Sequence, residues 1–344
     1  MDIPRRYQRR RRNTIHARGS AGVGAHVQRR PSVSASASAA DARPDEVDAL
    51  LGGEPSTAPL AAARALAAFI RTNAPLLVLT GAGCSTDSGI PDYRDRDGHW
   101  KRSEPIRYQR FVRDPAARRR YWARSYVGWP RVAAARPNTT HHALATLEAR
   151  GLVSQIVTQN VDGLHQRAGA RRVLDLHGRL DVVDCLDCGL RLSRNRVQAL
   201  LASCNPHCAP VAPEQSAPDG DVLLGDALQA DFRVPDCPRC EGMLKPAVVF
   251  FGENVPKPRV AHAMQQLERA GGLLVVGSSL TVFSGYRFCR RAAQTRQPMA
   301  LLNRGRTRAD DLGALKLDSD CAATLAAVLQ LLGHGAAQPA PLAG

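Results

Sequence analysis

The chain has 344 residues, 44% of them hydrophobic, and a formal net charge of +16. This length can hold one large domain, or a large lobe with a smaller one attached. No apolar run reaches the roughly 20 residues that a membrane-spanning helix needs, which excludes an integral membrane protein of that kind.

The positive charge is concentrated at the start of the chain. Residues 1–40 contain nine arginines and one acidic residue, followed by a Ser/Ala-rich stretch. Such a segment cannot bury a core, so we expect residues 1–50 to form a disordered basic extension and residues 336–344 a disordered tail. The alternatives for the extension are a transit peptide or a segment that binds nucleic acid or an anionic membrane.

The predicted elements alternate between strands and helices along the chain. A first helix is expected within 51–75, ending near Asn73, and residues 95–150 are predicted as helices and a loop with inward-packed aromatic side chains. The predicted strands are 76–80, 153–160, 171–178, 247–252, 272–280 and 298–305. Later helices are predicted over 258–270, 284–296 and about 320–332. This alternation indicates an α/β fold with a doubly wound, Rossmann-like parallel sheet.

Four of the nine cysteines form two Cys-x-x-Cys pairs, Cys185/Cys188 and Cys237/Cys240. Four thiolates at this spacing make a closed tetrahedral Zn²⁺ site, so the metal is expected to be structural. A competing ligand set, Cys204, His207 and Cys208, lies between the pairs; it is either a second metal site or an incidental surface cluster. We therefore expect a smaller zinc-binding lobe, with its zinc-binding module at 179–245.

Small, amide and hydroxyl side chains follow four of the predicted strands. They are Gly81, Ala82 and Gly83; Gln159, Asn160 and Asp162; Gly277, Ser278 and Ser279; and Asn303, Arg304 and Gly305. Ligands of open α/β sheets bind at the carboxyl ends of strands, so one extended ligand such as an adenine dinucleotide explains all four. Glycines would let backbone N–H groups approach its pyrophosphate. The spacing departs from Gly-x-Gly-x-x-Gly, however, and a tight turn is the alternative.

His177 ends another predicted strand. A histidine at such a position is more often a satisfied core residue. Beside a nucleotide site it becomes a candidate general base, because its ordinary pKa lies near operating pH.

Long motifs along residues 55–335 resemble those of sirtuins, the NAD-dependent protein-lysine deacylases. They are GAGCSTDSGIPDYR, TQNVDGLHQRAG, LHG, the paired Cys-x-x-Cys, KPAVVFFGE, VVGSSL and LLNRG, in this order. PDYRDRDGHW, the insertion containing APDGDVLL, and FFGENVP resemble the class II branch. Cys84 departs from the family, which usually has an aliphatic residue there.

The resemblance implies an NAD-binding lobe made of 51–178 and 246–335, with the helical insertion at about 95–150 belonging to the small lobe. It implies that residues 81–83 face the NAD phosphates, and that a loop with Ser85, Asp92, Tyr93 and Arg94 covers the nicotinamide ribose. Gln159, Asn160 and Asp162 would hold the ribose and nicotinamide. The adenosine half would be held by Gly277, Ser278, Ser279, Asn303, Arg304, Gly305 and the backbone of Cys321.

The implied reaction consumes NAD. Nicotinamide leaves, the carbonyl oxygen of an acyl-lysine captures the ribose, and His177 deprotonates a ribose hydroxyl, with Asn160 and Asp162 also catalytic. The products are free lysine, nicotinamide and O-acyl-ADP-ribose. Val249, Phe250 and Phe251 would line the acyl-lysine tunnel or else form an ordinary buried strand. The backbone of Gly252 and Glu253 would pair with the peptide.

Three other functions remain open at this point. They are a mono-ADP-ribosyltransferase on the same scaffold, a zinc-ribbon nucleic-acid binder and an NAD dehydrogenase. The expected partners are NAD and acyl-lysine proteins, with no specific nucleic acid and no membrane span. The expected location is the cytoplasm for a bacterial source, or the mitochondrial matrix for a eukaryotic one.

Overall fold

The computed structural model describes residues 57–92, 105–208 and 231–333. The predicted disordered segments 1–50 and 336–344 lie outside these residues, as do Tyr93 and Arg94. No described helix is long and apolar enough to cross a membrane.

Six parallel strands form the larger sheet, in the order β3-β2-β1-β7-β8-β9. Their bounds are Leu76–Thr80 (β1), Val153–Thr158 (β2), Val173–Asp175 (β3), Gly272–Val276 (β7), Met299–Leu302 (β8) and Leu315–Leu317 (β9). The strand order reverses between β1 and β7. This is a topological switch point, where open α/β sheets form their ligand crevice.

The central strands β1, β7 and β8 of this sheet are buried on both faces. In β1, Leu76 and Val78 point into one hydrophobic core, whereas Leu77 and Leu79 point into another. This is why the sequence of β1 is apolar throughout rather than alternating. The buried run fixes the sheet at the centre of the large lobe.

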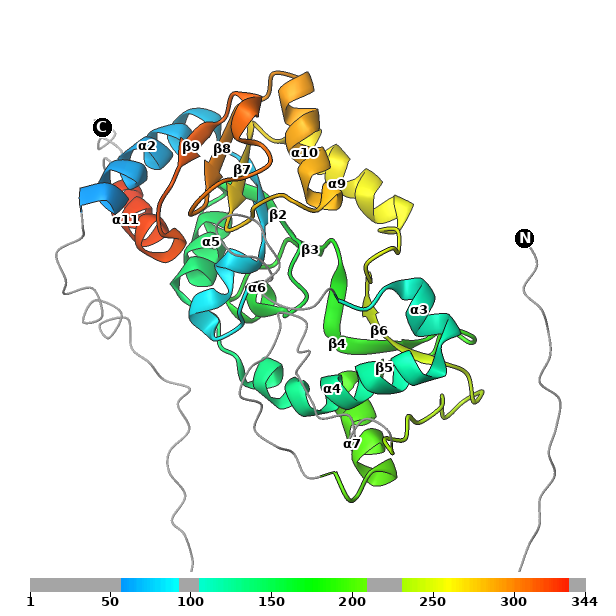
Figure 1. The fold of residues 1–344 in the computed structure, drawn as a ribbon. Helices are drawn as coiled ribbons and strands as arrows, with labels where there is room; N and C mark the ends of the chain where they lie inside the picture. The colour runs from blue at the N-terminus through cyan, green and yellow to red at the C-terminus, as the bar shows by residue number, and fades with distance from the viewer. Residues whose placement is uncertain (1–56, 93–104, 209–230, 334–344) are drawn as a thin grey trace, which may run out of the picture. The chain divides into compact units, whose positions relative to one another are not determined.

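Helices cover both faces of the larger sheet (Figure 1). Their bounds are Thr57–Asn73 (α2), Thr139–Ala149 (α5) and Cys321–Gly333 (α11) on one face, and Lys257–Arg269 (α9) and Phe283–Gln294 (α10) on the other. The short helix α6, Leu164–Arg167, follows β2. The predicted doubly wound α/β fold is confirmed.

A second, three-stranded antiparallel sheet has the order β5-β4-β6. Its strands are Gly178–Cys185 (β4), Arg191–Ser193 (β5) and Leu244–Val248 (β6). Helices α3 (Tyr108–Arg113), α4 (Pro115–Ala134) and α7 (Arg194–Cys204) share its hydrophobic core, which holds Phe111, Trp122 and two of the paired cysteines. This is the smaller lobe.

Several predicted strands are shorter in the structure, and two differences change which lobe a segment belongs to. The strand expected at 247–252 is β6, which begins at Leu244 and belongs to the small sheet. It includes Lys245, which is buried because it pairs with Glu253 (Nζ–Oε2 3.0 Å). The helical insertion expected at 95–150 is also not wholly part of the small lobe: α5 packs on α11 and β2, and Leu144 and Leu147 lie in the core of the larger sheet.

Candidate active site

The floor of the candidate site is a contact between the carboxyl ends of β1 and β7. The Gly81 N–H donates to the Val276 carbonyl (3.1 Å), and the Gly83 N–H donates to the Gly277 carbonyl (2.9 Å). A Cβ on Gly81 would lie 2.7 Å from the Ser278 Cβ. Gly277 has φ +61, and a Cβ there would lie 2.5 Å from the Cys84 nitrogen. These glycines are needed because two backbones touch.

This contact corrects part of the sequence interpretation. The N–H groups of Gly81 and Gly83 are already used by β7, so they are not available to an anion as expected. Ala82, which lies between these two glycines, lines the cavity above this floor.

A cavity of about 720 Å³ opens above the glycine contact. This lies within the roughly 300–1,000 Å³ range of small-molecule pockets. The predicted site residues that line it are Gly81, Ala82, Gly83, Ser85, Asp92, Gln159, Asn160, Asp162, His177, Val249, Phe250, Phe251, Gly252, Glu253, Gly277, Ser278, Ser279, Asn303, Arg304 and Cys321. Gly305 is not among the lining residues; its N–H donates to Asp318 Oδ1 (3.0 Å).

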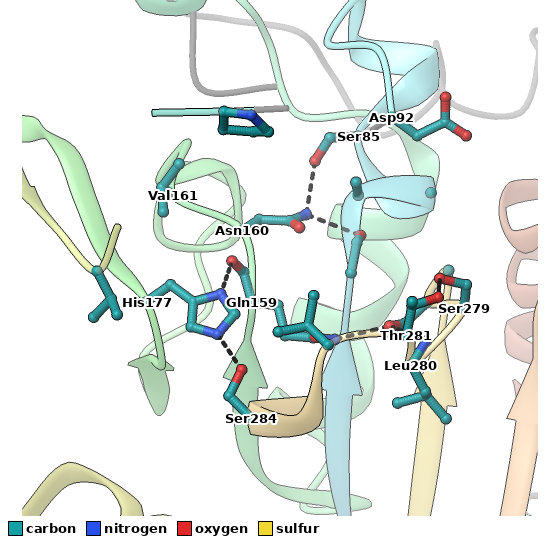
Figure 2. A pocket seen from close by; sticks show the side chains of 18 of the residues that line it. Ser85, Asp92, Gln159, Asn160, Val161, His177, Ser279, Leu280, Thr281 and Ser284 are labelled. Carbon is teal, nitrogen blue, oxygen red and sulfur yellow. Dashed lines mark hydrogen bonds between the residues drawn. The ribbon is translucent and has the colours of Figure 1, made fainter. Parts of the chain in front are cut away.

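Amide and hydroxyl groups after β1, β2 and β7 bond to one another across the cavity (Figure 2). Asn160 Nδ2 donates to the Gly81 carbonyl (2.9 Å) and to Ser85 Oγ (3.1 Å). Gln159 Nε2 donates to Ser278 Oγ (2.8 Å). Three separate strand ends are therefore held in one fixed arrangement before any ligand binds.

Asp162 is part of the same network. Its Oδ2 accepts from Ser85 Oγ (2.7 Å) and its Oδ1 accepts from the Leu164 N–H (2.9 Å). Burial raises the pKa of this carboxyl, and the two hydrogen bonds oppose that rise. A raised pKa at a cavity wall is typical of a functional carboxyl.

His177 lies between two hydrogen-bond partners (Figure 2). Its Nδ1 is 2.9 Å from the Gln159 carbonyl, and its Nε2 is 2.7 Å from Ser284 Oγ. A carbonyl can only accept, so the ring proton sits on Nδ1 and the Nε2 lone pair faces the cavity. Burial lowers the pKa of His177 to about 4, which keeps the imidazole neutral at pH 7.

Two further histidines form a buried layer behind the cavity, and the sequence did not single them out. His165 Nε2 is 2.9 Å from Thr80 Oγ1, and His141 Nε2 is 3.4 Å from Ser85 Oγ. Their ring centroids are 4.8 Å apart. Burial lowers the pKa of His141 to about 3 and that of His165 to about 4.

The segment 249–253 forms the opposite wall. The Val249 N–H donates to the His177 carbonyl (2.8 Å), and Phe250 is buried against Phe111. The Gly252 carbonyl accepts from Gln109 Nε2 (2.8 Å), and the Glu253 N–H donates to the Phe250 carbonyl (3.0 Å). Two backbone groups expected to receive a peptide are thus occupied, and a peptide would have to use the others.

The four paired cysteines gather at the edge of the small sheet, and all four Sγ atoms lie within 4.8 Å of one another. Cys185 Sγ is 3.5 Å from Cys240 Sγ, and Cys188 Sγ is 3.8 Å from Cys237 Sγ. Tetrahedral zinc with bonds of roughly 2.3 Å requires sulfur atoms about 3.8 Å apart, so the donor set fits one Zn²⁺. Within the described residues, Cys204, His207 and Cys208 form no such cluster.

Several cavity residues were not predicted from the sequence. Ser284 and Arg287 come from the first turns of α10, and Tyr121 comes from α4. A serine or an arginine near the start of a helix carries no sequence signal of its own. Only the packing of α10 against β7 and β8 brings Ser284 to His177.

Comparison with known proteins identifies the family. A model described as the Sir2 family matches residues 81–284. An NAD-dependent protein deacetylase of Xanthomonas campestris pv. campestris is 56% identical over 266 residues, which are 77% of this chain and 90% of the relative. NAD-dependent protein deacetylase 2 of Bradyrhizobium diazoefficiens is 53% identical over 274 residues, 80% of this chain and 100% of the relative.

Solved structures agree with this family. A Sir2 in complex with a p53 peptide and NAD⁺ has 26% identity and a TM-score of 0.60, covering 79% of this chain and 99% of that one. A Sir2 bound to acetylated peptide has 26% identity and a TM-score of 0.61, and the match covers 78% of this chain and 98% of that one. The chain belongs to the Sir2 family, the sirtuins.

Proposed function

We propose that this protein is an NAD-dependent protein-lysine deacetylase. It removes an acyl group from lysine with NAD as co-substrate and gives nicotinamide and O-acyl-ADP-ribose. The observation that carries the proposal is His177: its Nε2 lone pair faces a cavity at the β1/β7 switch point, in a chain 53–56% identical to proteins with this name.

The residues at the strand ends fit a bound dinucleotide. The cavity runs along the carboxyl ends of β1, β2, β7 and β8, and Ala82 lines it above the glycine contact. We assign the nicotinamide half to Gln159, Asn160 and Asp162. The adenosine half is assigned to Gly277, Ser278, Ser279, Asn303, Arg304 and the backbone of Cys321. When bound, NAD supplies the ribose that accepts the acyl group.

The network around Asn160 fits a positioning role as well as a binding role. Its amide donates to both the Gly81 carbonyl and Ser85 Oγ, so it ties the loop after β1 to the loop after β2. Ser85 and Asn160 therefore present fixed polar groups to the ribose and to the nicotinamide. Fixed groups of this kind lower the entropic cost of reaching the reacting geometry.

His177 fits the role of general base. The Gln159 carbonyl holds the Nδ1 proton, so Nε2 carries the lone pair. The Ser284 hydroxyl donates to that lone pair, and a hydroxyl of the substrate would take its place to give up a proton. With a pKa of about 4, the neutral form is almost fully populated at pH 7. General-base assistance is typically worth about 10²–10⁴-fold in rate.

The acyl-lysine is assigned to the wall at 249–253. Val249 lies next to His177 through its backbone hydrogen bond, and Phe250 is buried in the small-lobe core. An apolar acyl-lysine stem passing Val249, Phe250 and Phe251 would arrive beside Nε2. The four clustered cysteines would hold one structural zinc, because four sulfur ligands leave no open coordination position.

Finer assignments follow from the sequence motifs and from the relatives. The class II branch is proposed from PDYRDRDGHW, the APDGDVLL insertion and FFGENVP, and a cytoplasmic location from the bacterial origin of the relatives. Arg94 and Tyr93 keep their proposed place near the nicotinamide, and Gly305 its place near the adenosine, as members of matching motifs.

The decisive experiment measures nicotinamide release from NAD by the purified full-length chain, with and without a panel of acyl-lysine peptides. We expect release to depend on one or more acyl peptides and O-acyl-ADP-ribose to form. His177→Ala is expected to abolish turnover while retaining zinc and NAD binding, whereas the exposed control His262→Ala retains turnover.

The competing activity gives a different result in the same assay. Release without any acyl peptide, with mass added to a protein, would establish mono-ADP-ribosyl transfer instead. Near-normal turnover by His177→Ala would contradict the role given to that residue.

A further inference from the structure

The rim of the cavity on the α10 side is apolar and exposed. Of the described residues, four large hydrophobic side chains are exposed, and two of these are the neighbours Val282 (38%) and Phe283 (47%). Both line the cavity. Adjacent exposed apolar residues at the mouth of a site indicate a surface that a ligand covers.

Two guanidinium groups flank this exposed ring. The Cζ atom of Arg287 is 5.2 Å from the Phe283 ring centroid, and that of Arg290 is 5.8 Å from it. Among the described residues, Phe283 is the only exposed Phe, Tyr or Trp, and the two cations lie close to its ring.

Neither guanidinium is neutralised within the described part of the chain. No ion pair there involves Arg287 or Arg290, and the Nε of Arg287 is buried without a hydrogen-bond partner. The next arginine of the helix differs: Arg291 pairs with Glu268 at 2.7 Å. A buried donor without a partner costs free energy, and a ligand that accepts from it would recover that cost.

Arg287 belongs to the reaction site as well as to the rim. Its side chain lines the cavity, one helical turn from Ser284. Its charge also acts on His177, where burial is the main cause of the lowered pKa and the charges of Arg259 and Arg287 lower it further. A carboxylate bound at Arg287 would therefore lie close to the reacting lysine.

We propose that Arg287 and Arg290 recognise an aspartate or glutamate of the protein substrate that flanks the acyl-lysine. Phe283 and Val282 cover the apolar stem of that residue, while the guanidinium groups bind its carboxylate. The proposal rests on the proposed function, since the peptide must enter at this mouth. A flanking residue is favoured over an acidic acyl group because Phe283 and Arg290 are exposed at the rim, whereas the acyl chain passes inward to buried Phe250.

The test uses matched acetyl-lysine peptides that carry Asp or Asn, and Glu or Gln, at each position next to the lysine. Affinity for the full-length protein is measured by fluorescence anisotropy, and kcat/KM by O-acetyl-ADP-ribose formation. We expect the acidic peptide to be preferred by about two- to fivefold for each guanidinium. The preference should shrink as salt is raised.

The variants separate this surface from its surroundings. Arg287→Gln and Arg290→Gln should each reduce the ratio of acidic to neutral peptide, and the double variant should bring it to about one. Arg291→Gln removes the same charge from the same helix at a paired position and should leave the ratio unchanged.

Three results would overturn the proposal. They are equal affinity of the wild type for acidic and neutral peptides, a ratio that survives in the double variant, and an Arg287→Gln defect seen only with acidic acyl groups such as succinyl-lysine. The anisotropy ratio does not depend on turnover, so it distinguishes this proposal from the proposed activity. Acid-dependent binding without O-acetyl-ADP-ribose would overturn the activity and keep the recognition surface.

Discussion

The Ser284 hydroxyl lies 2.7 Å from Nε2 of His177, the atom assigned as the base. It donates to the lone pair that a substrate hydroxyl must reach, so the two donors compete. Replacing Ser284 with Ala removes the competing donor. The substrate then no longer has to displace a hydrogen bond worth about 0.5–1.5 kcal/mol, which corresponds to about two- to tenfold in rate. We expect Ser284→Ala to raise kcat/KM by about that factor.

The measurement is a pH–rate profile of Ser284→Ala beside Ser284→Thr, which keeps the hydroxyl. The Thr variant should resemble the wild type. A fall in kcat for Ser284→Ala with unchanged KM would mean that the hydroxyl orients the imidazole rather than competing for it.

The buried histidines make folding stability depend on pH. His141 and His165 have folded pKa values of about 3 and 4, below the unfolded value of about 6.5. The unfolded chain therefore binds protons that the folded chain does not, and stability falls as pH drops below about 6.5. Each histidine contributes a loss of about 1.4 kcal/mol between pH 7.5 and 5.5.

Urea unfolding at these two pH values checks this expectation. Asp162 opposes the trend, because its raised pKa makes stability fall as pH rises through the folded value. His165→Gln should have a shallower pH dependence than the wild type, whereas the exposed control His142→Gln should match it. Identical free energies of unfolding at both pH values would refute the assignment of neutral, buried imidazoles.

Lys245 should contribute strongly to stability. Its side chain is 7% exposed and pairs with Glu253, which is 27% exposed. Removing one partner of a buried pair costs about 3–5 kcal/mol, and the partial exposure of Glu253 places Lys245→Met at about 3 kcal/mol. Lys316→Met is the control, because Lys316 and Asp310 form a 2.9 Å pair in which both side chains are more than a quarter exposed.

Chemical denaturation of the two variants gives the comparison. Lys316→Met should lose no more than about 1 kcal/mol. An equal loss of unfolding free energy in both variants would show that the buried pair of Lys245 contributes no more to stability than the exposed pair of Lys316.

Loss of zinc should unfold the small lobe before the large one. Cys185 and Cys237 lie in the same hydrophobic core as Trp122, whereas the large sheet has separate cores. Cys188→Ser or a chelator should remove one zinc per chain and abolish the near-ultraviolet signal of the tryptophans. Cys204→Ser should keep the metal; zinc loss from this variant would reinstate the ligand set with His207 and Cys208.

The sequence was sufficient for the central strands β1, β7 and β8 of the large sheet because they are continuous apolar runs. Leu76–Thr80 is buried on both faces, and a short run of this kind is typical of a strand in a parallel sheet that helices cover on both sides. The start of β6 could not be predicted, because Lys245 is acceptable inside it only through partners such as Glu253 and the Val248 carbonyl, which the fold brings to its ammonium group. Residues Leu315–Leu317 form a strand too short to give a periodic signal.

Some residues of the candidate site could likewise be predicted from the sequence, and others could not. Asn160 and Ser278 could be proposed because each follows an apolar strand, and strand ends converge in this fold. Ser284 and Arg287 could not, because α10 carries them to His177 through contacts distant in sequence. The sequence also suggested free amides at Gly81 and Gly83, whereas the carbonyls of Val276 and Gly277 already accept from them.

The glycine contact between β1 and β7 limits how this pocket can be redesigned. Gly81, Gly83 and Gly277 have no side chains, so the floor of the pocket offers no group that a substitution could replace with another. Even a methyl group would wedge the two strand ends apart and shift every ligand-facing loop that depends on them. New substrate preferences would therefore have to be engineered at the rim, in α10 and the segment 249–253, while the glycine floor is kept unchanged.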